Sequence, residues 1–141
     1  MHRVYLGLGA NIGDREATIR EAVRLIGERV GQVVRQSALI ETEPWGFQSE
    51  NAFLNGVVLV ETELAPRSVL KLTQDIEHSL GRTSKSSPSM GYHDRPIDID
   101  ILLYDDLTIS EPDLQIPHPL MTQREFVMKP LSEINHHLLK Q

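Results

Sequence analysis

A short alternation in the last third of the chain constrains the fold most. Residues 97–101 read Ile-Asp-Ile-Asp-Ile, so apolar and acidic side chains take turns. Successive side chains of a β-strand point to opposite faces. The alternation therefore predicts a strand whose isoleucines enter a core and whose two acidic residues, Asp98 and Asp100, lie side by side on the other face.

The remaining hydrophobic patterns predict two helices and three further strands. A strand at residues 4–9 ends in glycines, and strands follow at residues 33–41 and 53–62. Apolar residues at helical spacing predict helices over about residues 15–29, with Asp14 as N-cap, and from Ala65-Pro66 to Gly81. The order β-α-β-β-α-β predicts an α+β fold, a ferredoxin-like split βαβ sandwich with helices packed on an antiparallel sheet. We expect a single domain over residues 1–141.

Two stretches lack periodicity and predict loops. Residues 42–51 carry Pro, Gly and Asn, and residues 83–94 are rich in Ser, Gly and Pro. The second loop is expected to be mobile. Residues 104–119 are expected to turn through Asp105-Asp106, and the tail from Arg124 to about Asn135 to hold short helical or irregular pieces.

Composition and charge exclude several classes of protein. The chain has 141 residues and no cysteine, which rules out disulfides and thiolate metal sites. Its net charge of −6 argues against general binding to nucleic acid, which needs a basic surface. The apolar stretch at the N-terminus is too short for a signal peptide or a membrane span. We therefore expect a cytoplasmic monomer with small molecules as partners, and neither membrane nor nucleic acid.

The two carboxylates of the alternating strand suit a divalent cation. Side chains two apart on a strand are separated by about 6.6 Å, and two unpaired carboxylates held side by side repel each other. Mg²⁺ prefers carboxylate oxygens, and two metal ions about 3.5–4 Å apart can bridge phosphate oxygens. The alternative is an exposed polar strand face without metal, which is the more frequent case when spacing alone is considered.

Basic residues surround this strand in the sequence: Arg82, Lys85, Arg95, His118 and Arg124. A guanidinium group can donate two parallel hydrogen bonds to phosphate oxygens. Taken singly, each of these residues is more often ordinary surface charge. Acidic residues for a metal together with basic residues for phosphate are, however, the combination that phosphoryl transfer requires.

Glycines follow the first strand but do not form a known nucleotide motif. Gly7, Gly9 and Gly13 miss the spacing of the dinucleotide fingerprint, and the chain has no P-loop, so any nucleotide is held in another way. We expect these glycines to let the chain turn tightly near a ligand. Gln74 and Glu77 lie beside the apolar stripe of the second helix, where a solvated face is the commoner interpretation.

Aromatic residues and one amide leave two interpretations open. Trp45, Phe53 and Phe126 can line a slot for a flat ring, or each can belong to the core. Asn55 interrupts an otherwise apolar strand. A buried amide needs hydrogen-bond partners, and a heterocycle with alternating donors and acceptors would supply them.

Several short motifs occur in a fixed order along nearly the whole chain. They are LGANIGD at residues 8–14, ETEPWG at 41–46, FLN at 53–55, QDIE at 74–77 with Gly81-Arg82, DRPIDIDIL at 94–102, IPHP at 116–119 and REF at 124–126. With these motifs the chain resembles the 6-hydroxymethyl-7,8-dihydropterin pyrophosphokinases. The resemblance implies a ferredoxin-like α+β fold and transfer of pyrophosphate from ATP to the pterin hydroxymethyl group, releasing AMP, in folate biosynthesis.

The same resemblance implies roles for individual residues. Asp98 and Asp100 would bind two Mg²⁺ ions, and Arg82 and Arg95 would join them as catalytic residues. The pterin would be contacted by Thr42, Trp45, Phe53, Asn55 and Phe126. ATP would be contacted by Gln74, Glu77, Arg82, Arg95, His118 and Arg124. The loop from Thr83 to Asp94 would close over both substrates, although Ser84 followed by Lys85 stands where the family often has a second Arg.

Two other classes of function remain as alternatives. A different metal-dependent nucleotidyl or phosphoryl transferase can also use an Asp-x-Asp pair, but it has no need for Thr42, Asn55 and flanking aromatic residues. A non-catalytic ferredoxin-like binding module is the second alternative. Such a module has no reason to gather two acidic residues and the four basic residues Arg82, Arg95, His118 and Arg124 around one strand.

Overall fold

The computed structural model describes the chain except for residues 12, 43–52, 82–96, 119–124 and 135–141. Seven strands and three helices lie in the described part. In chain order they are β1 (His2–Ala10), α1 (Arg15–Arg29), β2 (Gln32–Gln36), β3 (Ile40–Thr42), β4 (Phe53–Thr62), α2 (Pro66–Ser79), β5 (Asp98–Tyr104), β6 (Ile109–Glu111), β7 (Leu114–Ile116) and α3 (Glu125–Ile134). None of the helices in these ranges is long and apolar enough to span a membrane.

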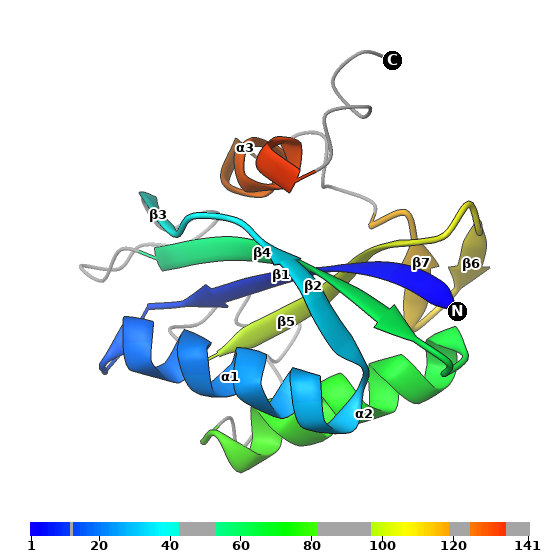
Figure 1. Ribbon diagram of the computed structural model, residues 1–141, viewed down its shortest axis with the longest axis horizontal. Coiled ribbons are helices and arrows are strands. Elements are labelled where there is room, and N and C mark those ends of the chain that lie inside the picture. Colours follow the sequence, from blue (N-terminus) through cyan, green and yellow to red (C-terminus); the bar gives the residue numbers. More distant parts are fainter. Residues whose placement is uncertain (12, 43–52, 82–96, 119–124, 135–141) are drawn as a thin grey trace.

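The main sheet is antiparallel, and β1 lies in its interior between β4 and β5. Its strand order is β2-β4-β1-β5, and β3 also pairs with β4. Strands β6 and β7 form a separate hairpin. Helices α1 and α2 cover one face of the sheet, and α3 lies over the other (Figure 1). The predicted α+β sandwich with an antiparallel sheet is confirmed.

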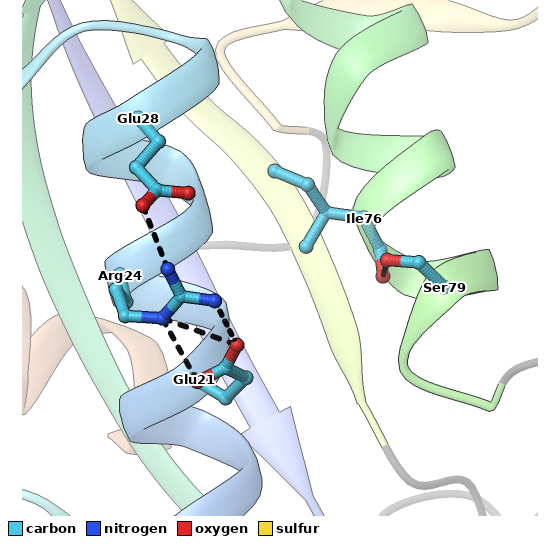
Figure 2. Close-up of polar contacts among 5 residues, drawn as sticks. All are labelled: Glu21, Arg24, Glu28, Ile76 and Ser79. Atoms are coloured by element: carbon cyan, nitrogen blue, oxygen red, sulfur yellow. Dashed lines mark hydrogen bonds and ion pairs between the residues drawn. The ribbon is translucent and has the colours of Figure 1, made fainter.

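The face under α1 and α2 holds the larger hydrophobic core. Strand β1 contributes Val4, Leu6 and Leu8, none more than 3% exposed. From α2, Ile76 points towards the space between the two helices and is fully buried (Figure 2). Burial of apolar surface contributes about 25 cal/mol per Å², so this layer is the main source of folding free energy.

Helix α1 begins and ends where its sequence predicts. The Asp14 carboxylate accepts a hydrogen bond from the Ala17 backbone N–H at 3.1 Å, which satisfies one of the free amides of the first turn. On the solvent side, Arg24 donates to Glu21 and to Glu28 from one turn of helix to the next (Figure 2). Such exposed pairs contribute little to stability, and the helix is held mainly by its buried face.

One predicted strand is divided in two. Residues 33–41 were expected to be continuous, but β2 ends at Gln36 and β3 starts at Ile40. Between them, the Ser37 hydroxyl accepts a hydrogen bond from the Val57 N–H at 2.9 Å and replaces a strand-to-strand bond. Leu39 lies against Gly56, where a Cβ would approach its Cδ2 to 2.7 Å. A side-chain hydrogen bond to β4 and a close contact with Gly56 therefore accompany the interruption of the strand, and neither is visible in hydrophobic periodicity.

The predicted turning role of two glycines is wrong. Gly7 and Gly9 lie inside β1 and pair with both neighbouring strands, because the strand continues to Ala10. The third glycine, Gly13, does adopt a left-handed conformation, with φ of 69°. Gly7 and Gly9 are therefore extended residues, and because they have no side chain, other groups can approach the main chain at these positions.

Candidate functional site

The polar residues of β5 lie on the sheet face opposite the large core. Asp98 pairs with Gly9 of β1, and Asp100 pairs with Gly7. Directly opposite residues of an antiparallel pair project to the same face. Ile99 and Ile101 are at most 6% exposed and belong to the core on the other side, whereas Asp98 and Asp100 are half-buried. The alternation predicted from the sequence is thus confirmed as a strand with one core face and one acidic face.

The row that starts at Asp98 continues across the sheet to an amide. Gly9 pairs with Asp98 on one side and with Asn55 of β4 on the other. Two strand spacings separate Asp98 from Asn55, or about 10 Å. A Cβ at Gly9 would lie 2.9 Å from the Asn55 Oδ1 and 3.6 Å from Phe53 Cδ1. The middle of the row is therefore main chain alone, with an amide on one side and a carboxylate on the other.

Two predicted pterin residues belong to this same face. Phe53 and Asn55 are two apart on β4 and project together. Asn55 is 5% exposed and Phe53 is half-buried. Thr42 pairs with Phe53 in the register of β3 and β4, which places its backbone at the same end of the sheet. Sequence positions assigned to two different ligands, a flat ring and a metal, are thus brought to one surface.

Beyond Asn55 on β4 and Asp100 on β5, the same face becomes apolar and is covered by α3. Val57, Leu59 and Leu102 form a second cluster with Leu131 and Ile134 of the helix. The Arg35 guanidinium also donates to the Ile134 carbonyl at 3.5 Å. Helix α3 therefore covers the apolar part of this face.

The outer edge of β5 is bordered by two of the predicted ATP residues. The Glu77 carboxylate of α2 accepts the Ile99 backbone N–H at 2.7 Å, and Glu77 is only 8% exposed. The His118 backbone N–H donates to the Leu102 carbonyl at 3.0 Å, and the His118 side chain is half-buried. Gln74, one turn before Glu77, is exposed. The described part of the predicted ATP set thus lies beside the acidic strand.

The side chains of the remaining predicted site residues lie outside the described part of the structure. Thr42 and Phe126 are placed in β3 and α3 by their backbone, and their side chains are not described. The other predictions of this kind are Trp45, Arg82, Arg95, Arg124 and the loop from Thr83 to Asp94. For these residues the roles given above stay predictions.

The donor set fits Mg²⁺ bound together with phosphates. Asp98 and Asp100 offer carboxylate oxygens from adjacent positions of one strand face. Within the described ranges, no group of three or more His, Asp or Glu residues could enclose an ion. Mg²⁺ is typically held by one or two carboxylates plus waters and substrate phosphates, and not by a complete protein cage. Two carboxylates on one strand face are therefore a suitable set for this metal when a phosphate ligand completes the shell.

Solved structures define the class of fold. A structure of HPPK-DHPS in complex with substrates resembles this chain with a TM-score of 0.74 at 15% sequence identity. The likeness covers 94% of this chain and 40% of the longer chain of that structure. At this low identity the likeness establishes the fold alone, which is that of an HPPK domain.

Sequence comparison identifies the family. The family model of 7,8-dihydro-6-hydroxymethylpterin-pyrophosphokinase (HPPK) matches residues 5–136. A 2-amino-4-hydroxy-6-hydroxymethyldihydropteridine pyrophosphokinase from Porphyromonas gingivalis is 50% identical over 132 residues, which cover 93% of this chain and 89% of that protein. One of the same name from Bacillus subtilis is 42% identical over 131 residues, covering 92% and 76%. The chain belongs to the HPPK family of pyrophosphokinases.

Proposed function

We propose that this chain transfers pyrophosphate from ATP to 6-hydroxymethyl-7,8-dihydropterin on the sheet face between Asn55 and Asp98. The family supports the activity, which belongs to folate biosynthesis. The row Asp98–Gly9–Asn55 supports the location, because it places an acidic group and a buried amide on either side of a glycine, which has no side chain. This row is the single observation on which the placement depends.

The pterin is assigned to the Asn55 side of the row. A side-chain amide offers both a donor and an acceptor, which suits the alternating donors and acceptors of a pterin edge. The Phe53 ring lies beside Asn55 and offers an apolar surface to a flat ring. Thr42, Trp45 and Phe126 complete the proposed pterin contacts.

The phosphates of ATP are assigned to the Asp98 side. We propose that Asp98 and Asp100 hold two Mg²⁺ ions, which would offset the negative charge of the phosphates. Arg82 and Arg95 are the proposed catalytic cations. The proposed ATP contacts are Gln74, Glu77, Arg82, Arg95, His118 and Arg124.

The reaction requires positioning more than covalent work from the protein. The pterin hydroxymethyl oxygen attacks the β-phosphorus of ATP in line and loses its proton. The bond between that phosphorus and the oxygen bridging to the α-phosphorus breaks, and AMP leaves with the electron pair. We assign no protein base, because holding both substrates in line and offsetting charge are the main tasks in such transfers.

The proposed working state is a cytoplasmic monomer with a single domain over residues 1–141. The absence of cysteine is compatible with a reducing compartment, and the net charge of −6 disfavours nucleic acid. Size-exclusion chromatography with light scattering tests the monomer. A mass of twice 15.9 kDa would contradict it.

Nucleotide analysis after incubation with ATP, Mg²⁺ and the hydroxymethyl pterin tests the function. AMP and a pterin diphosphate are expected in equal amounts, and chelation of Mg²⁺ should stop the reaction. ADP would indicate a simple phosphoryl transferase, and release of free pyrophosphate would indicate a nucleotidyl transferase. Nucleotide binding without turnover would favour the non-catalytic module.

A further inference from the structure

Glu77 stands apart from the other charged residues by its burial. In the described ranges it is the only Asp, Glu, Lys, Arg or His side chain that is less than 9% exposed. Moving a carboxylate out of water is costly unless hydrogen bonds compensate. The Ile99 backbone N–H supplies such a bond at 2.7 Å. A solvated helix face, the commoner interpretation of this position from sequence, is thus wrong for Glu77.

The bond reaches the acidic strand between its two aspartates. Ile99 lies between Asp98 and Asp100, and its side chain is buried in the opposite core. Among the described strands, β5 has β1 on one side and no neighbour on the other. A carboxylate that accepts an edge N–H therefore replaces the missing neighbouring strand at this residue.

Helix α2 gives this bond a rigid base. Ile76, adjacent to Glu77, is 0% exposed, and Thr73, one turn earlier, is 1% exposed. Ile99 belongs to the same core cluster as Ile76. The helix and the strand are thus fixed to one core, and Glu77 connects them through the main chain of the strand.

We infer that Glu77 is a positioning residue that holds the main chain between Asp98 and Asp100 and so fixes the direction of both carboxylates. The inference rests on the proposed function for the role of those two residues. It assigns Glu77 an action through the strand, in addition to the contact with ATP proposed above. A group that orients metal ligands without touching the metal typically changes metal affinity about 10- to 100-fold when it is removed.

Two substitutions and a control separate these roles. Glu77→Ala removes the acceptor, whereas Glu77→Gln keeps an acceptor oxygen of similar reach. Thr62→Ala is the control, because the Thr62 hydroxyl makes a buried hydrogen bond to the Val30 carbonyl at 2.6 Å, far along β4 from the site. Like Glu77→Ala, Thr62→Ala removes one buried hydrogen bond, but this bond does not involve β5.

Three measurements are made on each protein. Amide hydrogen exchange follows Ile99, titration of Mn²⁺ in the presence of a non-hydrolysable ATP analogue gives metal affinity, and steady-state kinetics give the KM for ATP. In Glu77→Ala, we expect the Ile99 amide to exchange at least about tenfold faster, since its acceptor is gone. We also expect Mn²⁺ affinity to fall about 10- to 100-fold. Glu77→Gln should restore most of both, and Thr62→Ala should change neither.

The outcomes distinguish this inference from the proposed function. Protection of Ile99 that survives in Glu77→Ala, or equal losses in Thr62→Ala, would overturn the positioning role. Normal Mn²⁺ affinity combined with a raised KM for ATP would overturn it in favour of direct nucleotide contact. A wild-type protein that forms AMP but is indifferent to Glu77→Ala refutes only this inference. A wild-type protein that forms no AMP refutes the proposed function itself.

Discussion

On one face of the main sheet, β1 contributes Val4, Leu6 and Leu8 to a closed apolar layer under two helices; on the other face the same strand contributes Gly7 and Gly9. Alternate residues of this single strand thus have different roles on the two faces of the sheet. The first face excludes water and stabilises the fold. The second has glycines, without side chains, between an amide and two carboxylates. Stability and chemistry can therefore be altered separately, and substitutions on either face test that separation.

The largest expected effect is on catalysis at the polar face. Asp98→Ala should lower kcat for AMP formation by at least about 1000-fold, or roughly 4 kcal/mol, because a proposed metal ligand is lost. The thermal unfolding midpoint should stay within a few degrees, since the side chain is not part of the core. Near-normal turnover at saturating Mg²⁺ would remove the basis for assigning chemistry to this face.

The next effect is on stability at the apolar face. Leu6→Ala should lower the free energy of unfolding by about 2–5 kcal/mol, because Leu6 is 0% exposed and its removal leaves a cavity. Urea denaturation measures the loss. The kcat of the fraction that remains folded should be nearly unchanged, and a large fall in that kcat would mean that the two faces are coupled.

A smaller effect, on pterin binding, is expected from a substitution at Gly9 of β1. In Gly9→Ala the new Cβ would lie 2.9 Å from the Asn55 Oδ1, so the amide must move. The KM for the pterin should rise about tenfold, the value of one hydrogen bond, while the KM for ATP changes little. Gly7→Ala is the matched control, since its Cβ would meet the Leu102 methyl groups at an ordinary 3.4 Å.

A double-mutant cycle sharpens this test. If the clash with Asn55 causes the effect, Gly9→Ala should add little to the pterin KM in an Asn55→Ala background. Full additivity of the two substitutions would instead mean that Gly9 acts independently of the amide.

The smallest effect concerns a carboxylate that belongs to neither face. Burial opposes ionisation of Asp105, but hydrogen bonds from the Arg3 backbone N–H at 2.7 Å and from the His2 ring outweigh it, and together they lower its pKa. Because the folded pKa is below the unfolded value, the stability that Asp105 contributes is present above about pH 4 and is lost as the pH falls through the folded pKa.

Asp105→Asn should therefore cost under about 1 kcal/mol at pH 7, and the difference from wild type should shrink in acid. Asn tolerates the positive φ of 48° at this position. Urea denaturation at several pH values measures the trend, and kcat should not change. If the difference in unfolding free energy between wild type and Asp105→Asn instead grows below pH 4, the pKa of Asp105 is not lowered by folding.

Local patterns predicted α1, α2 and the long strands well, whereas the region of α3 (Glu125–Ile134) was expected to hold only short helical or irregular pieces. The range of α1 followed from its N-cap and apolar spacing, and β4 followed from its apolar run. The acidic face of β5 followed from period two alone. These features depend on neighbours along the chain, which is why the sequence reveals them.

Features that depend on contacts between distant segments were missed. The break between β2 and β3 requires the Ser37 bond to Val57, and the hairpin of β6 and β7 was expected only as a turn. In the site, the role of Gly9 became clear only from the register, which pairs it with Asn55 and Asp98. Register is a long-range property, and no local pattern encodes which residues will face each other.

The central position of β1 also has a consequence for the order of folding. The strand is made before both of its partners, which are β4, starting at Phe53, and β5, ending at Tyr104. Loops of that length must close before β1 acquires either neighbour, so folding is expected to be slow compared with helical proteins of this size. During synthesis, both edges of β1 stay open until β4 emerges, and the row from Asn55 to Asp98 is completed only when β5 docks.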